Sequence, residues 1–291
     1  MVTGASGVVG RSVVKAMLAT DEVRATVRRA DAAEPLRGLG AKVTVRAGMH
    51  ADELAEVLPR CHTLVHLVGG VAQADPEDLY RANHGSLLVA IEAARMAGTQ
   101  RIVFLSVPGA DPDHQHPFLR AKGMAERSLA DSGLDYAILR CTHAYGLGGL
   151  WFTATVHGAL ATPPFTCGPG TQELAPVFAD DIGAVVAAMD DRADPLRGTW
   201  GLEGPDALRA DALVSLLRDD DMPATHADGQ AAAAALTTVL GTPIDAVTAS
   251  FFGMPCRRDA PDAAAVFGVR RTALLEGLRA TLAASAANDP G

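Results

Sequence analysis

Three glycines near the start of the chain have the spacing of a phosphate-binding loop. The segment MVTGASGVVGRSVVKAML places Gly4, Gly7 and Gly10 directly before a helical pattern. Residues without a side chain let the backbone approach a pyrophosphate, and the first N–H groups of the helix are free to donate hydrogen bonds to it. The pattern therefore indicates a dinucleotide site. Only residues 1–3 precede it, so we expect either an unusually short first strand or a natural start further upstream.

A pair of arginines, Arg28 and Arg29, follows the second predicted strand. Sites that prefer NAD have an acidic residue at this point, which binds the 2′-hydroxyl of the ribose. A guanidinium group instead binds a 2′-phosphate through its planar pair of N–H groups. The pair therefore favours NADP over NAD. The alternative is two arginines that only face solvent.

The segment HQHPFLRAK, residues 114–122, combines titratable and apolar side chains at the start of a predicted helix. In many nicotinamide-dependent reductases a tyrosine stands four residues before a lysine such as Lys122 and transfers the proton. Here that position is Phe118, which has no hydroxyl. His114 and His116 are alternative acids because histidine titrates near neutral pH, or they are solvated loop residues.

Short apolar segments alternate with helical patterns through the first two-thirds of the chain. Such an alternation is typical of a parallel sheet with helices on both faces, so it predicts an α/β fold of the doubly wound Rossmann type. In these sheets the ligand lies at the carboxyl ends of the strands. The predicted strands are residues 23–27, 42–45, 63–69, 101–106 and 135–140.

The pattern loosens after residue 140, where glycine, proline and aromatic residues become frequent. We expect residues 1–145 to form a dinucleotide-binding Rossmann core and residues 146–291 to form a small substrate-binding lobe. Segments at about 175–204 are expected to return to the core sheet. We expect Asp180–Asp181 to cap the helix that follows. Residues 220–260 show mostly helical or loop-like patterns.

Composition and charge exclude several classes of protein. The chain has 291 residues, of which 48% are hydrophobic, and its net charge is −9. A large core is therefore available, whereas a general nucleic-acid surface would need clustered positive charge. The cysteines are too widely spaced to form a zinc site, and we expect no metal. The sequence contains no signal peptide and no apolar run of roughly 18 residues. We expect a cytoplasmic monomer or weak homodimer without membrane contact.

Several segments taken together resemble one family. VTGASGVVG, ATVRR, VHLVGG, RIVFLSVPGAD, HPFLRAKGMAERSL, SGLDYAILRCTHAYGLGG and LAPVFADDIGAVVAAM follow one another over about residues 1–220. Their order is similar to that of atypical short-chain dehydrogenases/reductases of the NmrA-like branch. The resemblance implies a Rossmann fold, an NAD(P) cofactor and a small carboxy-terminal substrate lobe. Within the branch, the chain is most similar to ketoreductases of angucyclinone-type antibiotic pathways.

The resemblance also assigns roles by position. Ser106 matches the family's catalytic serine, and Lys122 matches the lysine that holds the nicotinamide ribose. Arg28 matches the arginine at the 2′-phosphate, with Arg29 as a helper. Two departures are the replacement of an aspartate near the adenine by Gly48 and the replacement of the tyrosine by Phe118. The other matched cofactor positions are Gly4, Ser6, Gly7, Val8, Val9 and Gly10 in the phosphate loop, Leu67, Val68 and Gly69 beside the adenosine ribose, and Cys141, Thr142 and His143 under the nicotinamide.

The loss of the tyrosine need not abolish reduction of a carbonyl. A general acid contributes roughly 10²–10⁴ in rate, or about 3–5.5 kcal/mol. Holding the nicotinamide and the carbonyl in reacting geometry can supply about 7–11 kcal/mol, which is the larger effect. The alkoxide that forms can be stabilised by Ser106, by water or by a phenol of the substrate itself.

Four aromatic residues are candidates for contact with a flat aromatic substrate. Phe118 would add an apolar wall. Trp151 and Phe152 lie in a glycine-rich segment and either clamp the substrate or belong to the core. Tyr145 either turns toward the substrate or packs in the interior.

These residues predict an NADPH-dependent ketoreductase that reduces a carbonyl of a bulky aromatic polyketide in antibiotic biosynthesis. One alternative is a redox sensor that binds NADP and a protein partner without chemistry, which the absence of the tyrosine favours. Another is an epimerase or dehydratase with bound NAD, which Arg28 disfavours. The substrate, the face of hydride attack and the replacement proton donor stay open.

Overall fold

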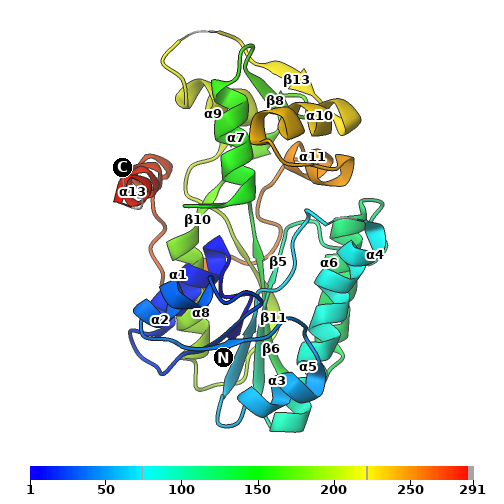
Figure 1. Ribbon diagram of the computed structural model, residues 1–291, viewed down its shortest axis with the longest axis vertical. Coiled ribbons are helices and arrows are strands. Elements are labelled where there is room, and N and C mark those ends of the chain that lie inside the picture. The colour runs from blue at the N-terminus through cyan, green and yellow to red at the C-terminus, as the bar shows by residue number, and fades with distance from the viewer. Residues whose placement is uncertain (74, 221, 288–291) are drawn as a thin grey trace.

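The computed structural model describes residues 1–73, 75–220 and 222–287 (Figure 1). In this part of the chain, seven parallel strands form one sheet in the order β3–β2–β1–β4–β5–β6–β11. The Rossmann-type sheet predicted from the sequence is confirmed. The strands are β1 (Val2–Thr3), β2 (Arg24–Val27), β3 (Lys42–Val45), β4 (Thr63–His66), β5 (Arg101–Ser106), β6 (Asp135–Cys141) and β11 (Arg197–Leu202).

The first strand is unusually short, which is one of the two alternatives expected from the sequence. β1 has two residues, and Val2 and Thr3 pair with β2 on one side and with β4 on the other. The amino group of Met1 is buried and donates a hydrogen bond to the carbonyl of Thr63 at 3.0 Å. Two residues are enough because both neighbours are already held in the sheet.

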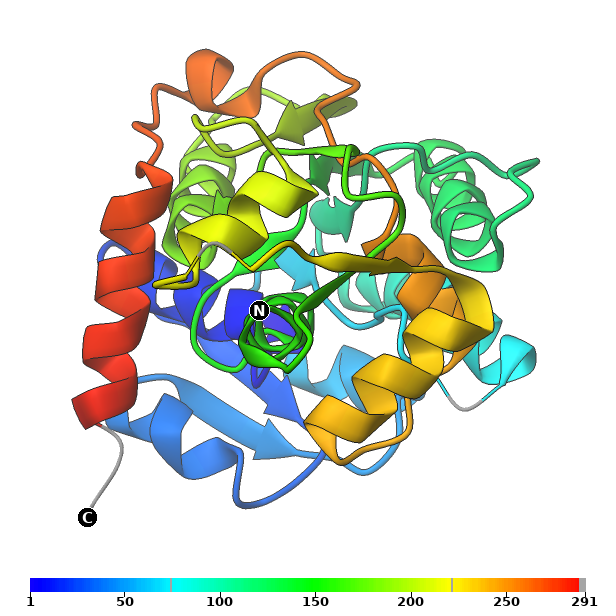
Figure 2. The ribbon, with the colours of Figure 1, turned by 90° about the horizontal axis from the view of Figure 1, so that it is seen from above.

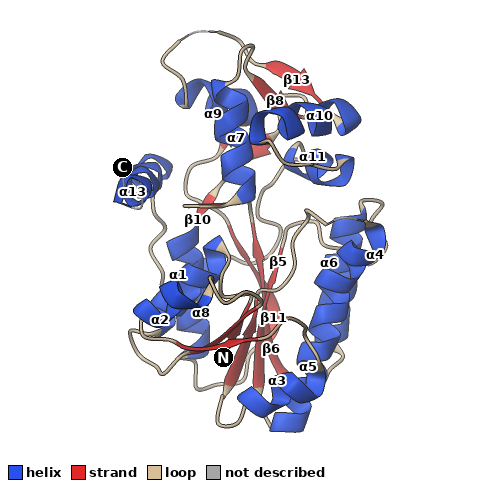
Figure 3. Cartoon of the chain, in the orientation of Figure 1, coloured by secondary structure: helices blue, strands red, loops and turns tan. Residues whose placement is uncertain are grey.

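Helices cover both faces of the sheet (Figures 1 and 3). Strand side chains alternate between the two faces: Val65 and Val103 pack under the first group of helices, whereas Leu64 and Phe104 pack under the second. The first group is α1 (Val8–Met17), α2 (Ala33–Gly38), α8 (Ala179–Asp190) and α12 (Ala263–Phe267), and the second is α3 (Ala51–Val57), α5 (Ser86–Ala97) and α6 (Pro117–Ala130).

A smaller lobe stands above the carboxyl edge of the sheet in Figure 1. Figure 2, a view from above, shows α7 end-on near the middle, with α9 and α10 on either side. Trp151, Phe165, Leu213, Leu236 and Phe252 lie in its apolar core. The lobe includes α7 (Leu150–Leu160), β8 (Phe165–Cys167), β9 (Glu173–Leu174), β12 (Leu208–Arg209), α9 (Ala210–Leu216), β13 (Thr225–Ala227), α10 (Gly229–Leu240) and α11 (Ala246–Phe252).

The remaining elements connect the sheet with the lobe. α4 (Pro76–Tyr80) and a π-helical turn (Arg81–Gly85) lead into α5. β7 (Ala144–Tyr145) pairs with β10 (Val177–Phe178), and α13 (Leu274–Ala287) ends the described chain. None of the helices in this described part is long and apolar enough to cross a membrane.

Segments after residue 175 return to the sheet. β11 pairs with β6, and α8 packs beside α1 in the layer below the lobe. The division between residues 1–145 and 146–291 stays a prediction, and residues 288–291 lie outside the described residues. One difference from the sequence is β13, which pairs with β8 inside the segment expected to be helical or loop-like.

The predicted capping role of Asp180 and Asp181 is wrong. The residue that precedes α8 is Phe178, and both aspartates lie in the first turn of the helix. Asp180 accepts a hydrogen bond from Ser12 Oγ at 2.6 Å, whereas Asp181 accepts one from Thr272 Oγ1 at 2.7 Å. The two carboxylates therefore bind neighbouring segments, while their charge still complements the positive end of the helix.

Arg101 is buried at the bottom of the sheet and binds the end of α8. Its side chain is 1% exposed. A charged group at this depth needs partners for its donors. Most partners of Arg101 are backbone carbonyls, and only its Nε has none among the described residues. Nη1 donates to the carbonyls of Met189, Asp190 and Arg192, and Nη2 donates to the carbonyl of Asp194 and to Asp135 Oδ2.

We expect Arg101→Gln to lower the free energy of unfolding by about 3–5 kcal/mol, because several buried acceptors lose their partner. Urea unfolding measures this change. Arg197→Gln is the matched control, since Arg197 is exposed and makes one long hydrogen bond of 3.4 Å to the carbonyl of Gly133. Its effect should stay within about 0.5 kcal/mol. Equal losses for the two variants would contradict this role of Arg101.

Candidate cofactor and active site

The strand order changes direction between β1 and β4. β2 and β3 extend the sheet on one side of β1, whereas β4, β5, β6 and β11 extend it on the other. In open parallel sheets the crevice for a ligand forms at the carboxyl ends of the strands at such a point. Gly4 and Leu67 directly follow β1 and β4, and Ser106 and Cys141 are the last residues of β5 and β6, which places these predicted site residues at this edge.

Close backbone contacts require glycine at positions 4 and 10. Gly4 has a φ of +73°, and a Cβ there would lie 2.7 Å from the carbonyl carbon of Leu67. A Cβ on Gly10 would lie 2.4 Å from the carbonyl oxygen of Gly4. Gly7 differs, because a Cβ there would come no closer than 3.6 Å to any atom given for it. Its open side is where a ligand can approach.

The predicted phosphate-loop residues divide into exposed and buried ones. Ser6 and Gly7 are exposed and Val8 is half-buried, whereas Val9 and Gly10 are buried. Gly7 precedes α1 without a side-chain cap, and the first turn has no acidic residue. The first N–H groups of a helix without such a cap remain free to bind an anion. The loop therefore fits a pyrophosphate, with Val9 and Gly10 as its support.

The two arginines after β2 have different environments. Arg29 makes a two-pronged ion pair with Asp31, with 3.0 Å from Nε to Oδ1 and 2.8 Å from Nη2 to Oδ2. This pairing raises the pKa of Arg29 and lowers that of Asp31. Arg28 is exposed and has no ion-pair partner among the described residues. The free guanidinium of Arg28 fits a phosphate, whereas that of Arg29 is already bound.

The loop after β4 is held by a residue that the sequence analysis missed. β4 ends at His66, so Leu67, Val68 and Gly69 lie in a loop and not in the predicted strand. Asn83 is fully buried in the π-helical turn, and its Oδ1 accepts a hydrogen bond from Gly70 N at 3.0 Å. Its Nδ2 donates to the carbonyls of Gly70 and Leu79, both at 2.9 Å. No periodicity marks Asn83, because its partners come together only in the folded chain.

Ser106 is the last residue of β5, and Lys122 of α6 reaches the same end of that strand. Ser106 is 1% exposed, and its Oγ has no hydrogen-bond partner in the described part of the chain. Lys122 Nζ donates to the carbonyl of Leu105 at 2.9 Å and lies 4.6 Å from the centroid of the Phe104 ring. Burial lowers the pKa of Lys122 to about 8. A buried hydroxyl without a partner and a buried ammonium group with one partner can both bind a ligand.

Cys141 ends β6, Thr142 and His143 follow it, and the three side chains have different environments. Cys141 is buried, and burial raises the pKa of its thiol. Thr142 Oγ1 donates to the carbonyl of Ala175 at 2.6 Å, so its hydroxyl is used within the fold. His143 is buried, and its Nε2 has no hydrogen-bond partner among the described residues. Burial lowers the pKa of His143 to about 3, so the ring is neutral at pH 7.

An aromatic group lies beside these polar residues. The His143 ring stacks on Trp151 with centroids 4.6 Å apart. Phe251 of α11 contacts His143 and Phe118 edge-on, with centroids 5.2 Å and 4.8 Å away. Phe252 is the next neighbour of His143, at 6.3 Å. Two of the four predicted substrate residues, Phe118 and Trp151, therefore belong to one aromatic group, and Phe251 is a member that sequence reasoning missed.

Tyr145 and Phe152 lie in a second cluster. Their ring centroids are 5.9 Å apart, and Tyr145 also contacts Phe178 at 5.4 Å. Tyr145 is 1% exposed and its hydroxyl has no partner among the described residues. Burial raises the pKa of this phenol. A Cβ on Gly277 would touch its hydroxyl, so α13 covers the ring closely.

His114 and His116 also differ from each other. His116 Nε2 lies 2.9 Å from Ser250 Oγ and 3.1 Å from the carbonyl of Val247, both in α11. His114 Nδ1 accepts a hydrogen bond from the backbone N–H of His116 at 2.9 Å. His116 therefore links the start of α6 to the lobe, and the interpretation of it as a solvated loop residue is wrong.

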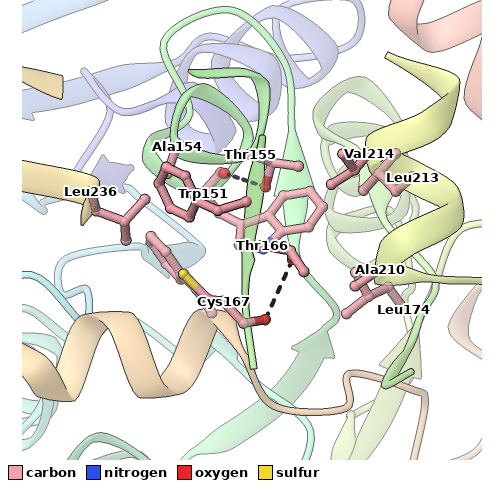
Figure 4. A pocket seen from close by; sticks show the side chains of 12 residues that line it. Trp151, Ala154, Thr155, Thr166, Cys167, Leu174, Ala210, Leu213, Val214 and Leu236 are labelled. Atoms are coloured by element: carbon pink, nitrogen blue, oxygen red, sulfur yellow. Dashed lines mark hydrogen bonds between the residues drawn. The ribbon is translucent and has the colours of Figure 1, made fainter. Parts of the chain in front are cut away.

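A cavity of about 20 Å³ lies within the lobe, next to Trp151. Figure 4 shows the Trp151 ring among the side chains that line this cavity, with Leu236 on one side and Leu213 and Val214 on the other. Such a volume has room for about one water molecule. It cannot hold a polycyclic ligand.

The burial of Lys122 predicts a stability that depends on pH. Its pKa is about 8 in the folded protein and near 10.5 when exposed, so between these values the unfolded chain binds more protons and the free energy of unfolding rises with pH. Lys122→Met removes the free-energy cost of burying the charged ammonium group. We expect the variant to be more stable than the wild type by about 3 kcal/mol at pH 7, and the difference should shrink as the pH approaches 10.5. Urea unfolding of both proteins across this range measures it, and a constant difference would contradict the prediction.

Comparison with known proteins agrees with this geometry. Residues 4–145 match a family model described as NAD(P)H-binding. A ketoreductase of Stigmatella aurantiaca, named for 4-hydroxy-2-methyl-3-oxo-4-farnesyl-3,4-dihydroquinoline-1-oxide, is 33% identical over 185 residues, which cover 56% of this chain and 55% of that protein. The photosystem II assembly factor Ycf39 of Cyanophora paradoxa is 28% identical over 151 residues, which cover 51% of this chain and 47% of that protein. The matches thus span about half the length of these relatives.

Solved structures share the fold over nearly the whole chain. MoeE5 in complex with UDP-glucuronic acid and NAD has a TM-score of 0.73 at 20% identity, and 98% of each chain is covered. At this level of identity the likeness shows the fold alone. Together with the family match, it identifies an NAD(P)-binding domain of the oxidoreductase type. Residues 4–145 of this chain thus match the NAD(P)H-binding family, and the ketoreductase and Ycf39 relatives agree with the resemblance to atypical short-chain dehydrogenases/reductases of the NmrA-like branch.

Proposed function

We propose that this protein is an NADPH-dependent ketoreductase that reduces a carbonyl of a bulky aromatic ketone, of the polyketide class, to an alcohol. One observation carries the proposal: the unpartnered hydroxyl of Ser106 and the ammonium group of Lys122 are buried at the carboxyl edge, close to the aromatic group of Phe118. The relative named as a ketoreductase of a farnesylated quinoline oxide supports the same class of reaction.

The residues at the edge fit a dinucleotide. The free N–H groups at the start of α1 would bind the pyrophosphate, Arg28 would bind the 2′-phosphate, and Lys122 would bind the nicotinamide ribose. When bound, the reduced nicotinamide supplies the hydride. We favour NADP over NAD because Arg28 has a free guanidinium group, and β2 is not followed by a free acidic side chain, since Asp31 is paired with Arg29.

Ser106 is the group that polarises the carbonyl in this proposal. Its Oγ–H donates to the carbonyl oxygen, where negative charge develops during reduction. Because the hydroxyl is buried and has no other partner among the described residues, it need not break a hydrogen bond to do so. Phe118 cannot supply a proton, so the proton comes from water or from a phenol of the substrate. Positioning then contributes more to the rate than acid catalysis does.

A second candidate function is that of a redox sensor that binds NADP and a protein partner. The absence of a hydroxyl at Phe118 favours it, as does the tight packing of aromatic rings next to the site. An NAD-using epimerase or dehydratase shares the fold of the solved structures, but Arg28 disfavours it.

We expect Arg28→Ala to weaken NADPH binding by about 10–100-fold and to leave NADH binding nearly unchanged, because only NADPH has the phosphate that the guanidinium group binds. Arg29→Ala is the matched control, since Asp31 already occupies that side chain, and its effect should be small. Fluorescence titration with both cofactors measures the affinities. Equal weakening of NADPH and NADH by Arg28→Ala would contradict the role.

Turnover separates the candidate functions. With NADPH and a panel of aromatic ketones, we expect the absorbance of the reduced cofactor to fall only when a ketone is present. Ser106→Ala should slow this reduction by less than about a hundredfold, because positioning is retained. Lys122→Ala should weaken cofactor binding severely. Tight binding of NADPH without turnover of every ketone would instead support the sensor.

A further inference from the structure

Phe251 is a residue of the lobe that lies between two residues of the core. It stands at the end of α11, and its ring meets Phe118 of α6 at an interplanar angle of 74° and His143 after β6 at 81°. Phe118 is in turn 6.0 Å from Lys122 Nζ, measured to the ring centroid. The Phe251 ring therefore closes the aromatic side of the candidate active site.

The position of this ring is one that a substrate ring could take. Aromatic pairs are favourable at centroid separations of about 4.5–7 Å in edge-to-face or offset arrangements. Phe251 makes two such contacts, at 4.8 Å and 5.2 Å. A flat ring of a ligand in the same place would make the same contacts with Phe118 and His143.

The neighbouring residues hold α11 in place without hydrogen bonds to the side chain of Phe251. Phe252, the next residue, is buried in the core of the lobe and holds the helix there. Asp245 caps the helix through Thr248, and His116 binds its middle through Val247 and Ser250. Phe251 is only half-buried. A rotation of its side chain leaves the cap and the hydrogen bonds of His116 in place, and it changes the longer ring contacts with His116 and Phe252, whose centroids lie 6.1 Å and 6.4 Å away.

The cavities beside this ring do not reach the reacting groups. The cavity of about 20 Å³ is next to Trp151, and a depression of about 350 Å³ lies along Ala249, Ser250 and Gly253 of the α11 segment. Neither is lined by Ser106, Lys122, Phe118 or His143. Sites for drug-sized ligands have volumes of about 300–1,000 Å³. Neither of these two spaces therefore gives a large ketone a path to Ser106.

We propose that Phe251 is the residue that sets the size of the substrate: its ring fills the slot between Phe118 and His143 and turns out of it to admit a flat polycyclic aromatic ketone. The inference rests on the proposed ketoreductase function. It names the class of substrate, with several fused rings, and the one side chain that the substrate must displace.

The test compares a ketone with three fused rings, 2-acetylanthracene, with a one-ring ketone, acetophenone, by NADPH consumption. In Phe251→Ala we expect the ratio of kcat/KM values, three-ring over one-ring, to rise by about tenfold, because the larger ketone no longer competes with the ring. Phe251→Leu should shift the ratio in the same direction and keeps an apolar side chain in case the alanine variant unfolds. Phe251→Trp should lower the ratio.

Phe267→Ala is the matched control. Phe267 is also half-buried and makes one edge-on contact, with Trp200 at 5.4 Å, on the face of the sheet covered by α12. It should leave the ratio unchanged. A ratio that stays within twofold of the wild type in Phe251→Ala, Phe251→Leu and Phe251→Trp would overturn the inference.

A binding measurement separates this inference from the proposed function. Trp151 stacks on His143, so quenching of its fluorescence in a Trp200→Phe background reports binding of the ketone whether or not it is reduced. If no ketone is turned over but Phe251→Ala still tightens binding of 2-acetylanthracene alone, the proposed reaction fails and the role of Phe251 stands. If turnover occurs but affinity for the two ketones changes equally, or if neither ketone binds any variant, the role of Phe251 fails.

Discussion

The close approach of α1 to the sheet is the constraint on which the rest of the site depends. Gly10 lies so near the carbonyl of Gly4 that any side chain would collide with it. In the same layer, Gly183 of α8 lets that helix approach α1, since a Cβ there would lie 2.6 Å from the carbonyl oxygen of Ser12. With α1 held against both the loop after β1 and α8, its uncapped start lies at the edge between β1 and β4 where the strand order reverses. The anion site follows from this packing.

The interior around Lys122 shows how an apolar ring can stand where a proton donor is usual. Phe104 and Phe118 surround the ammonium group, and one backbone carbonyl accepts its hydrogen bond. Burial disfavours the charge, and the aromatic faces offset part of that cost. The same rings make an apolar wall for a flat substrate. A tyrosine hydroxyl at Phe118 would introduce a polar group that needs its own partner in this wall.

The sequence predicts the sheet well and the site in part. Apolar segments that alternate with helical patterns predict β2 to β6. The glycine spacing locates the loop at Gly4, because the backbone geometry there requires a glycine. That Arg28 is free and Arg29 is paired could not be predicted, since this difference depends on the ion pair that Asp31 makes with Arg29 in the folded chain.

Residues whose role comes from distant contacts were missed. Asn83 and Phe251 lie in segments without a chemical motif, and they acquire their roles only when the π-helical turn meets Gly70 and α11 meets α6. β13 was missed because its three residues pair with β8 far away in the sequence. Such contacts carry no periodic signal.

A crystal structure of the complex with NADP⁺ tests the central claim most directly. We expect the pyrophosphate on the N–H groups at the start of α1, the 2′-phosphate on Arg28, and the nicotinamide ribose within hydrogen-bond reach of Lys122, beside Ser106. A dinucleotide bound away from this edge, or Arg28 and Lys122 both without contact to it, would contradict the account.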